Sequence, residues 1–168
     1  MTLPLKPARG GFLRPFGCGM FTRDFLLGLG PYDSARINPD IGAPQADIFR
    51  EYKNALRRIT ADDMAARQEE KQAKKANRAI DPSNIEALTM KYLEEIPYKS
   101  WGCRYSSYLK YFTLIKRLGW TEPSGKVELS EYQEHYAPGQ PRIYFRLSEK
   151  GKTALDSQWA NPYKALYQ

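Results

Sequence analysis

Apolar residues recur at spacings of three and four over the first half of the segment from residue 46 to residue 80. The residues that make this pattern are Ile48, Phe49, Tyr52, Leu56 and Ile59. This spacing places apolar side chains on one side of an α-helix, so we predict a helix over 46–79. The second half keeps strong helix formers but has little to bury. We expect it to project as a solvated spacer, with a basic nucleic-acid-binding helix as the alternative.

The first 45 residues combine frequent glycine and proline with bulky apolar side chains. Glycine and proline interrupt helices and sheets, so we predict an extended arm over residues 1–45. A disordered linker is usually poor in large apolar residues, so a floppy tail is the weaker alternative. We expect the arm to bury its apolar side chains on the body of the protein or on a partner. The residues that we assign to partner binding are Phe12, Phe16, Phe21 and Phe25.

Two more helices are predicted between residues 81 and 118. The segment 84–96 is amphipathic, and Pro97 ends it. The segment 98–105 fits either a short helix or a turn. Residues 106–118 predict a long helix that is closed by Gly119, because glycine readily takes the left-handed conformation common at helix ends.

One side of the 106–118 helix is polar and the opposite side is apolar. At about 100° per residue, four small polar or basic residues fall within about 60° of one another. They are Ser106, Lys110, Thr113 and Arg117, and we call them the polar stripe. An α-helix fits the major groove of B-DNA, where such side chains reach base edges and phosphates. An amphipathic helix whose outer face is simply hydrated explains the same pattern.

A β-hairpin and a last helix are predicted after residue 119. The segments 126–136 and 142–147 are rich in strand formers, and 137–141 fits only a turn or loop. Ser148 is suited to cap a helix that continues through Trp159. The predicted fold is therefore mainly α with a small β-hairpin. Its main domain spans 81–161, follows the extended arm and the long helix, and precedes a tail at 162–168.

The order of helix, turn, helix, hairpin and helix resembles the winged helix-turn-helix arrangement. The segment 108–120 (YLKYFTLIKRLGW) looks like the recognition helix of bacterial winged-helix regulators. The segment 142–155 (RIYFRLSEKGKTAL) is similar to the last strand and closing helix of the same superfamily. The resemblance covers about half of the chain. It implies that the polar stripe enters a groove while Arg104 and Arg142 position the domain on the nucleic-acid backbone.

The composition adds a signal for an acidic partner that is weak by itself. The net charge is +7 and the isoelectric point is about 9.4, which favours nucleic acid or an anionic surface. Cys18, Cys103 and His135 are too few for an ordinary zinc site, and no catalytic motif is present. We therefore expect a non-enzymatic protein without metal or cofactor. No stretch reaches the ~18 apolar residues of a membrane span, and the cysteine usage suits a cytoplasmic location.

The sequence thus predicts a nucleic-acid-binding protein, with DNA favoured over RNA. The alternative is a structural or accessory subunit of a larger protein or ribonucleoprotein assembly, anchored by its N-terminal arm. Both hypotheses allow a protein partner or a homodimer contact through the N-terminal arm and the long helix.

Overall fold

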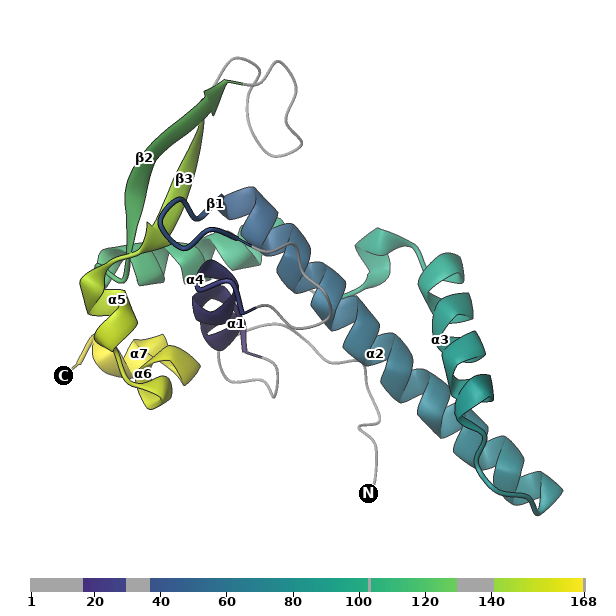
Figure 1. The fold of residues 1–168 in the computed structure, drawn as a ribbon. Helices are drawn as coiled ribbons and strands as arrows, with labels where there is room; N and C mark the ends of the chain where they lie inside the picture. Colours follow the sequence, from purple (N-terminus) through teal and green to yellow (C-terminus); the bar gives the residue numbers. More distant parts are fainter. Residues whose placement is uncertain (1–16, 30–36, 103, 130–140, 168) are drawn as a thin grey trace.

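The computed structural model describes residues 17–29, 37–102, 104–129 and 141–167 (Figure 1). The helices and strands in chain order are α1 (Cys18–Leu26), β1 (Ala43–Pro44), α2 (Gln45–Ala76), α3 (Pro82–Glu95), the 3-10 helix η1 (Tyr98–Ser100), α4 (Tyr105–Arg117), β2 (Thr121–Leu129), β3 (Pro141–Leu147), α5 (Glu149–Thr153), α6 (Asp156–Ala160) and α7 (Pro162–Ala165). The described chain is mainly helical with a small antiparallel sheet, which confirms the coarse prediction of the fold class.

Helix α1 corrects the prediction of an extended N-terminal arm. Its nine residues bury Phe21, Phe25 and Leu26 in the core. The ring of Phe21 lies 5.2 Å from that of Tyr52 in α2, and Thr22 Oγ1 lies within hydrogen-bond distance, 3.1 Å, of the Tyr108 hydroxyl in α4. The glycines that suggested an extended chain mostly flank this helix rather than interrupt it. A short helix of this kind is stabilised by the apolar face that it buries against the rest of the fold.

The sheet has three strands in the order β1-β3-β2, and both pairings are antiparallel. The third strand, β1, also comes from the segment expected to be part of the arm, and Pro44 pairs with Tyr144. Gly42 precedes it with φ +73°, and a Cβ there would lie 1.7 Å from the carbonyl oxygen of Phe145. Only glycine fits a position where two backbones approach this closely. The N-terminal segment is thus anchored at both α1 and β1.

The β-hairpin is present, but its first strand begins earlier than the sequence predicts. β2 starts at Thr121 instead of residue 126, and its register with β3 shifts between Pro123 and Val127. The sequence did not predict this early start, because Pro123 and Gly125, which has φ +94°, are both unfavourable in regular ladders. β3 spans Pro141–Leu147 and confirms the second predicted strand. Of the turn predicted at 137–141, only Pro141 lies within the described residues, and it is the first residue of β3.

Helix α2 is confirmed as one long helix, but its second half is not a solvated spacer. Helix α3 packs alongside it to form a helical hairpin (Figure 1). At the contact, Ala65, Glu69 and Ala73 of α2 are buried. The Glu69 carboxylate accepts hydrogen bonds from the Arg78 guanidinium and, at 3.3 Å, from the Asn84 amide. These two bonds tie the turn between the helices to α2.

We expected residues 81–161 to form one unit, but α3 and α4 pack against different parts of the chain. Helix α4 packs against α1 and α2, whereas α3 packs against the distal half of α2 (Figure 1). The centre of the core is an aromatic group in which the Tyr108 ring stacks 6.0 Å from that of Phe112. The Phe112 ring in turn meets that of Phe145 of β3 edge-on at 5.3 Å. The compact body around α4 therefore needs the N-terminal half of the chain.

The last predicted helix is divided into α5 and α6. Ser148 caps α5 as expected, because its Oγ accepts a hydrogen bond from the Gly151 backbone N–H at 3.1 Å. Ala154 and Leu155 are extended, and α6 then brings Trp159 into the core. The Trp159 ring lies 4.5 Å from that of Trp120, and its indole N–H donates to the Gly151 carbonyl at 2.9 Å. The break in the helix lets this large side chain reach a buried hydrogen-bond acceptor.

Candidate nucleic-acid interface

Helix α4 has one buried face and one exposed face, as its sequence predicts. Tyr108, Phe112 and Ile115 are fully buried. The four residues of the polar stripe, Ser106, Lys110, Thr113 and Arg117, are all exposed. The structure therefore brings these four side chains together on the outer surface of one helix.

The ends of α4 are fixed by backbone geometry. Arg104 has an extended backbone and directly precedes the helix. At the other end Gly119 has φ +74°. The Gly119 N–H donates to the Lys116 carbonyl at 2.9 Å, and the Trp120 N–H donates to the Ile115 carbonyl at 3.3 Å. These two bonds form a Schellman motif, which ends the helix immediately after the polar stripe.

The buried face of α4 is held by an aromatic cluster that joins it to α2. Tyr108 lies at its centre, with its ring 5.7 Å from that of Phe49 and 6.3 Å from that of Tyr52. The ring of Tyr105 meets that of Phe49 edge-on at 5.2 Å. Large aromatic contacts of this kind fix the orientation of a helix as well as its depth. The polar stripe is thus presented by a well-anchored helix.

The stretch of chain that contains α4 carries cations and no acids. No aspartate or glutamate occurs from residue 96 to residue 121, and the cations in that stretch are Lys99, Arg104, Lys110, Lys116 and Arg117. Among the described residues, no acidic side chain forms an ion pair with Lys110, Lys116 or Arg117. These cations are therefore available to an external anion.

Lys116 is a candidate that the sequence analysis did not assign. It lies away from the polar stripe on the helix, at the edge where α4 meets β3. Its Nζ lies 5.6 Å from the ring centroid of Phe112 and 5.4 Å from that of Phe145. Cation–π contacts hold the ammonium group there while it stays exposed. The contact of Lys116 with Phe145 could not be predicted from the sequence, because Phe145 is distant along the chain and is brought close only by the packing of α4 on the sheet.

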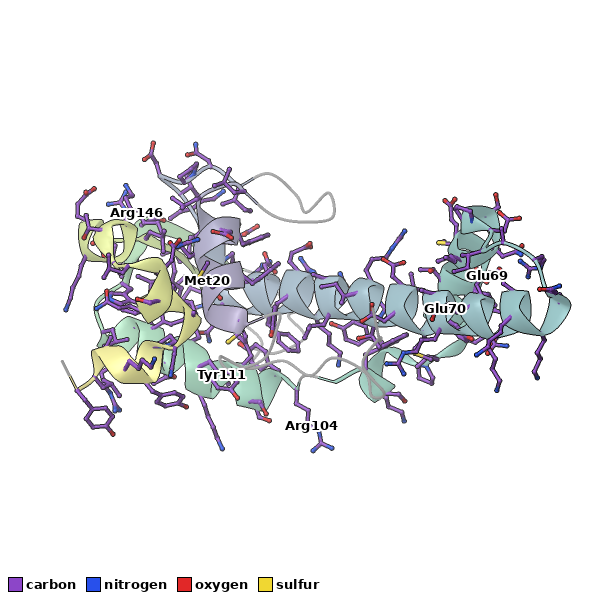
Figure 2. The ribbon with its side chains drawn as sticks, turned by 90° about the horizontal axis from the view of Figure 1, so that it is seen from below. Met20, Glu69, Glu70, Arg104, Tyr111 and Arg146 are labelled. Carbon is purple, nitrogen blue, oxygen red and sulfur yellow. The ribbon has the colours of Figure 1, made fainter. Side chains whose placement is uncertain are left out.

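The structure separates the two arginines that were expected to position the domain. Arg104 is exposed at the start of α4 (Figure 2). Arg142 is only partly exposed and forms an ion pair with Asp47 at the start of α2. The Asp47 carboxylate also forms an ion pair with the Arg50 guanidinium, at 3.3 Å. The charge of Arg142 is thus largely neutralised, and its first role is to connect β3 to α2.

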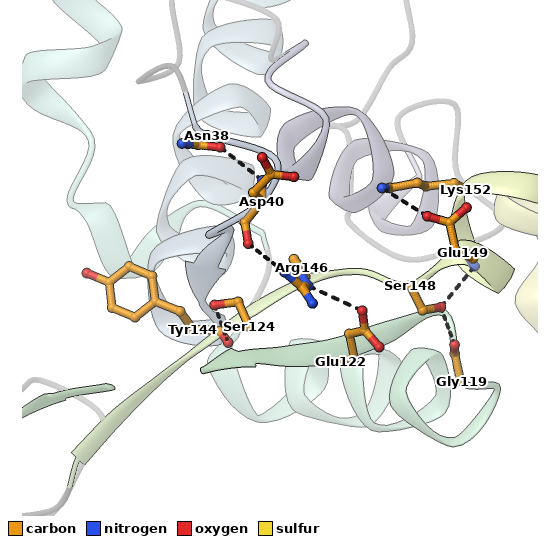
Figure 3. Close-up of polar contacts among 11 residues, drawn as sticks. Asn38, Asp40, Gly119, Glu122, Ser124, Tyr144, Arg146, Ser148, Glu149 and Lys152 are labelled. Carbon is orange, nitrogen blue, oxygen red and sulfur yellow. Dashed lines mark hydrogen bonds and ion pairs between the residues drawn. The ribbon is translucent and has the colours of Figure 1, made fainter. Parts of the chain in front are cut away.

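The outer side of the hairpin carries its own polar network. The Arg146 guanidinium donates to Glu122 at 3.2 Å and to the Asp40 carbonyl at 3.1 Å (Figure 3). The Tyr144 hydroxyl donates to Glu128, and this bond lowers the pKa of Glu128 and raises the pKa of Tyr144. These groups satisfy one another, so Arg146 adds little free charge to the surface near α4.

The predicted partner-binding phenylalanines divide into two groups. Phe21 and Phe25 are each only 2% exposed, and they pack in the core of this chain. They are therefore unavailable to a separate partner, which corrects the prediction for these two residues. Phe12 and Phe16 lie outside the described residues. The sequence allowed the arm to be buried either on the body of the protein or on a partner. Phe21 and Phe25 are buried on the body of the protein.

The described residues show neither a metal-ligand group nor a membrane-spanning helix. They contain no group of three metal-ligating side chains, and none of their helices is long and apolar enough to cross a membrane. Cys18 is buried at the start of α1, whereas Cys103 and His135 lie outside the described part of the chain. No protein-family model, curated protein or solved structure matches this chain.

Proposed function

We propose that this chain is a non-enzymatic protein that binds duplex DNA with the exposed face of α4. One observation carries the proposal. The helix buries an aromatic face in the core and exposes the polar stripe in a stretch of chain that has cations and no acids. Hydroxyl groups beside long cationic side chains can contact base edges and phosphates when a helix lies in the major groove.

The order of the elements supports a winged-helix arrangement for this body. Helix α1, strand β1, helix α2 and helix α4 are followed by the hairpin of β2 and β3, and the sheet order is β1-β3-β2. In this proposal α4 is the recognition helix, and the hairpin is the wing. The distal half of α2 together with α3 is then a helical hairpin inserted before the recognition helix. The proposed domain begins at α1 rather than at residue 81.

The side chains on α4 favour duplex DNA over RNA. Proteins that bind single strands stack bases on exposed aromatic rings, but Tyr108 is buried and Tyr105 packs against Phe49. The major groove of duplex RNA is too deep and narrow for side chains to read. The exposed residues of the polar stripe are short hydroxyls and cations, which suit the wide major groove of B-DNA.

The test is a salt titration of binding to duplex DNA and to duplex RNA, with Lys110→Ala and Arg117→Ala compared with the wild-type chain. Removal of a phosphate contact should flatten the slope of log affinity against log salt by about 0.9. Removal of a base contact should cost about 1–3 kcal/mol on a preferred site. Lys91→Ala is the matched control, because Lys91 is also exposed but lies on α3. Wild-type affinity in both stripe variants would refute the proposal.

A second candidate function is that of a subunit in a larger protein or ribonucleoprotein assembly. It is favoured by apolar side chains exposed near the C-terminal helices. They are Leu155, Tyr163, Leu166 and Tyr167. Exposed apolar groups that gather on one part of a protein mark contact surfaces. Under this candidate the stripe variants bind nucleic acid no differently from the wild-type chain, so the same titration separates the two functions.

A further inference from the structure

The helical hairpin of α2 and α3 has a basic side and an acidic side. On the distal part of α2 the exposed cations are Lys71, Lys74 and Lys75, and the exposed acid is Glu70. On α3 the exposed acids are Glu86, Glu94 and Glu95, and the exposed cation is Lys91. The second acid of distal α2, Glu69, is buried and paired with Arg78. The surface charge of the hairpin is thus segregated between its two helices.

The basic side of the hairpin faces the same way as α4. Glu69 marks the side of α2 that packs against α3, and Phe49 marks the side that packs against α4. At about 100° per residue, Lys71 lies about 160° from Glu69 and about 40° from Phe49 around the helix. Figure 2 shows α3 and α4 on opposite sides of α2. The cations of α2 and those of α4 therefore share one side of the molecule, and the acids of α3 lie on the other.

The local sequence leaves the charge of Lys71 and Lys75 uncompensated, whereas Lys74 has Glu70 four positions before it. Side chains three or four positions apart are neighbours on a helix, and like charges there destabilise it. Lys71 has Arg67, Gln68, Lys74 and Lys75 at these positions. Lys75 has Lys71 and Gln72 at the preceding positions, and the helix ends at Ala76. Neither lysine has an acid at these positions, so an external anion is the natural counter-charge for this row.

The length of α2 suits contact with a second part of a duplex. Lys71 follows Phe49 by 22 residues, which is about 33 Å at 1.5 Å per residue. One turn of B-DNA is about 34 Å long. A basic surface at this distance from α4 can therefore meet phosphates about one turn away from the groove that α4 occupies.

We propose that the basic side of distal α2, centred on Lys71 and Lys75, is a second contact surface for the phosphate backbone of the same DNA duplex. This inference rests on the proposed function of α4. The hairpin extends the DNA footprint by about one helical turn, and the acidic side of α3 keeps the opposite face of the hairpin away from the polyanion. The contact is with phosphates, so it adds affinity without adding sequence preference.

The test compares Lys71→Glu with Lys91→Glu on duplexes of about 12 and about 24 base pairs, that is, about one and two turns. Both changes reverse one exposed charge on the hairpin, so their effect on net charge is the same. We expect Lys71→Glu to bind the short duplex like the wild-type chain. On the long duplex it should bind more weakly, with a salt slope flatter by about 0.9 for each phosphate that the protein no longer neutralises. Lys91→Glu should keep the full gain on the long duplex.

Two results would overturn this inference. One is equal affinity of the two variants for the long duplex, and the other is weaker binding by Lys71→Glu on the short duplex alone. Binding of the short duplex that still depends on Lys110 and Arg117 leaves the proposed function of α4 intact in both cases. A wild-type chain that binds neither duplex overturns the proposed function itself, and the inference with it.

Discussion

Replacing Phe21 by alanine tests whether the N-terminal segment is part of the core or a separable arm. The Phe21 ring is 2% exposed and stacks 5.7 Å from that of Phe25. It also lies 5.2 Å from the ring of Tyr52 in the long helix. Removing a buried phenylalanine ring of this kind leaves a cavity and costs about 3–5 kcal/mol of unfolding free energy. Proteins are stable by only about 5–15 kcal/mol, so the change removes a large part of the total.

Urea denaturation of the isolated chain measures this effect. With a dependence of about 2 kcal/mol per molar urea, the unfolding midpoint of Phe21→Ala should fall by roughly 2 M. Leu29→Ala is the control, because Leu29 follows the same helix but its side chain is 66% exposed. We expect the control to change the unfolding free energy by less than about 0.5 kcal/mol. An arm that binds only a partner predicts equal midpoints for the two variants, and that result would refute the assignment of α1 to the core.

Three further predictions concern the sheet and its links to the helices. Gly42→Ala should destabilise the chain strongly in thermal denaturation, because the added methyl would overlap the backbone of β3 and because φ at this position is +73°. A melting temperature like that of the wild-type chain would contradict this close approach. Tyr144→Phe should raise the pKa of Glu128 towards its ordinary value of 4.5 in an NMR titration. The reason is that the substitution removes the hydrogen bond that favours the carboxylate. In the wild-type chain that bond stabilises the fold above pH 4.5, and the stabilisation disappears as the pH falls through the lowered pKa. Arg142→Ala should lower the stability of the fold, because it leaves Asp47 without its partner on β3. The same substitution should change the salt slope of DNA binding by much less than Lys110→Ala does. An equal change in slope would place Arg142 at the DNA.

The sequence by itself determined the elements whose cause is local. The apolar spacing of α2 and the two faces of α4 are properties of residues within a few turns of one another. The left-handed Gly119 and the cap at Ser148 depend on single residue types in their own turns. For the same reason the exposure of the polar stripe could be predicted, because burying one side of a helix exposes the opposite side.

The tertiary structure alone decided which elements form the body around α4. A short helix flanked by glycines is stable only when its apolar face is covered, and the residues that cover α1 include Tyr52 and Tyr108, far along the chain. Distal α2 was predicted to be solvated because no local pattern shows that α3 returns along it. The neutralisation of Arg142 by Asp47 likewise depends on the pairing of a strand with a distant helix. Local periodicity records which side of an element is buried, but it does not record which distant segment covers that side.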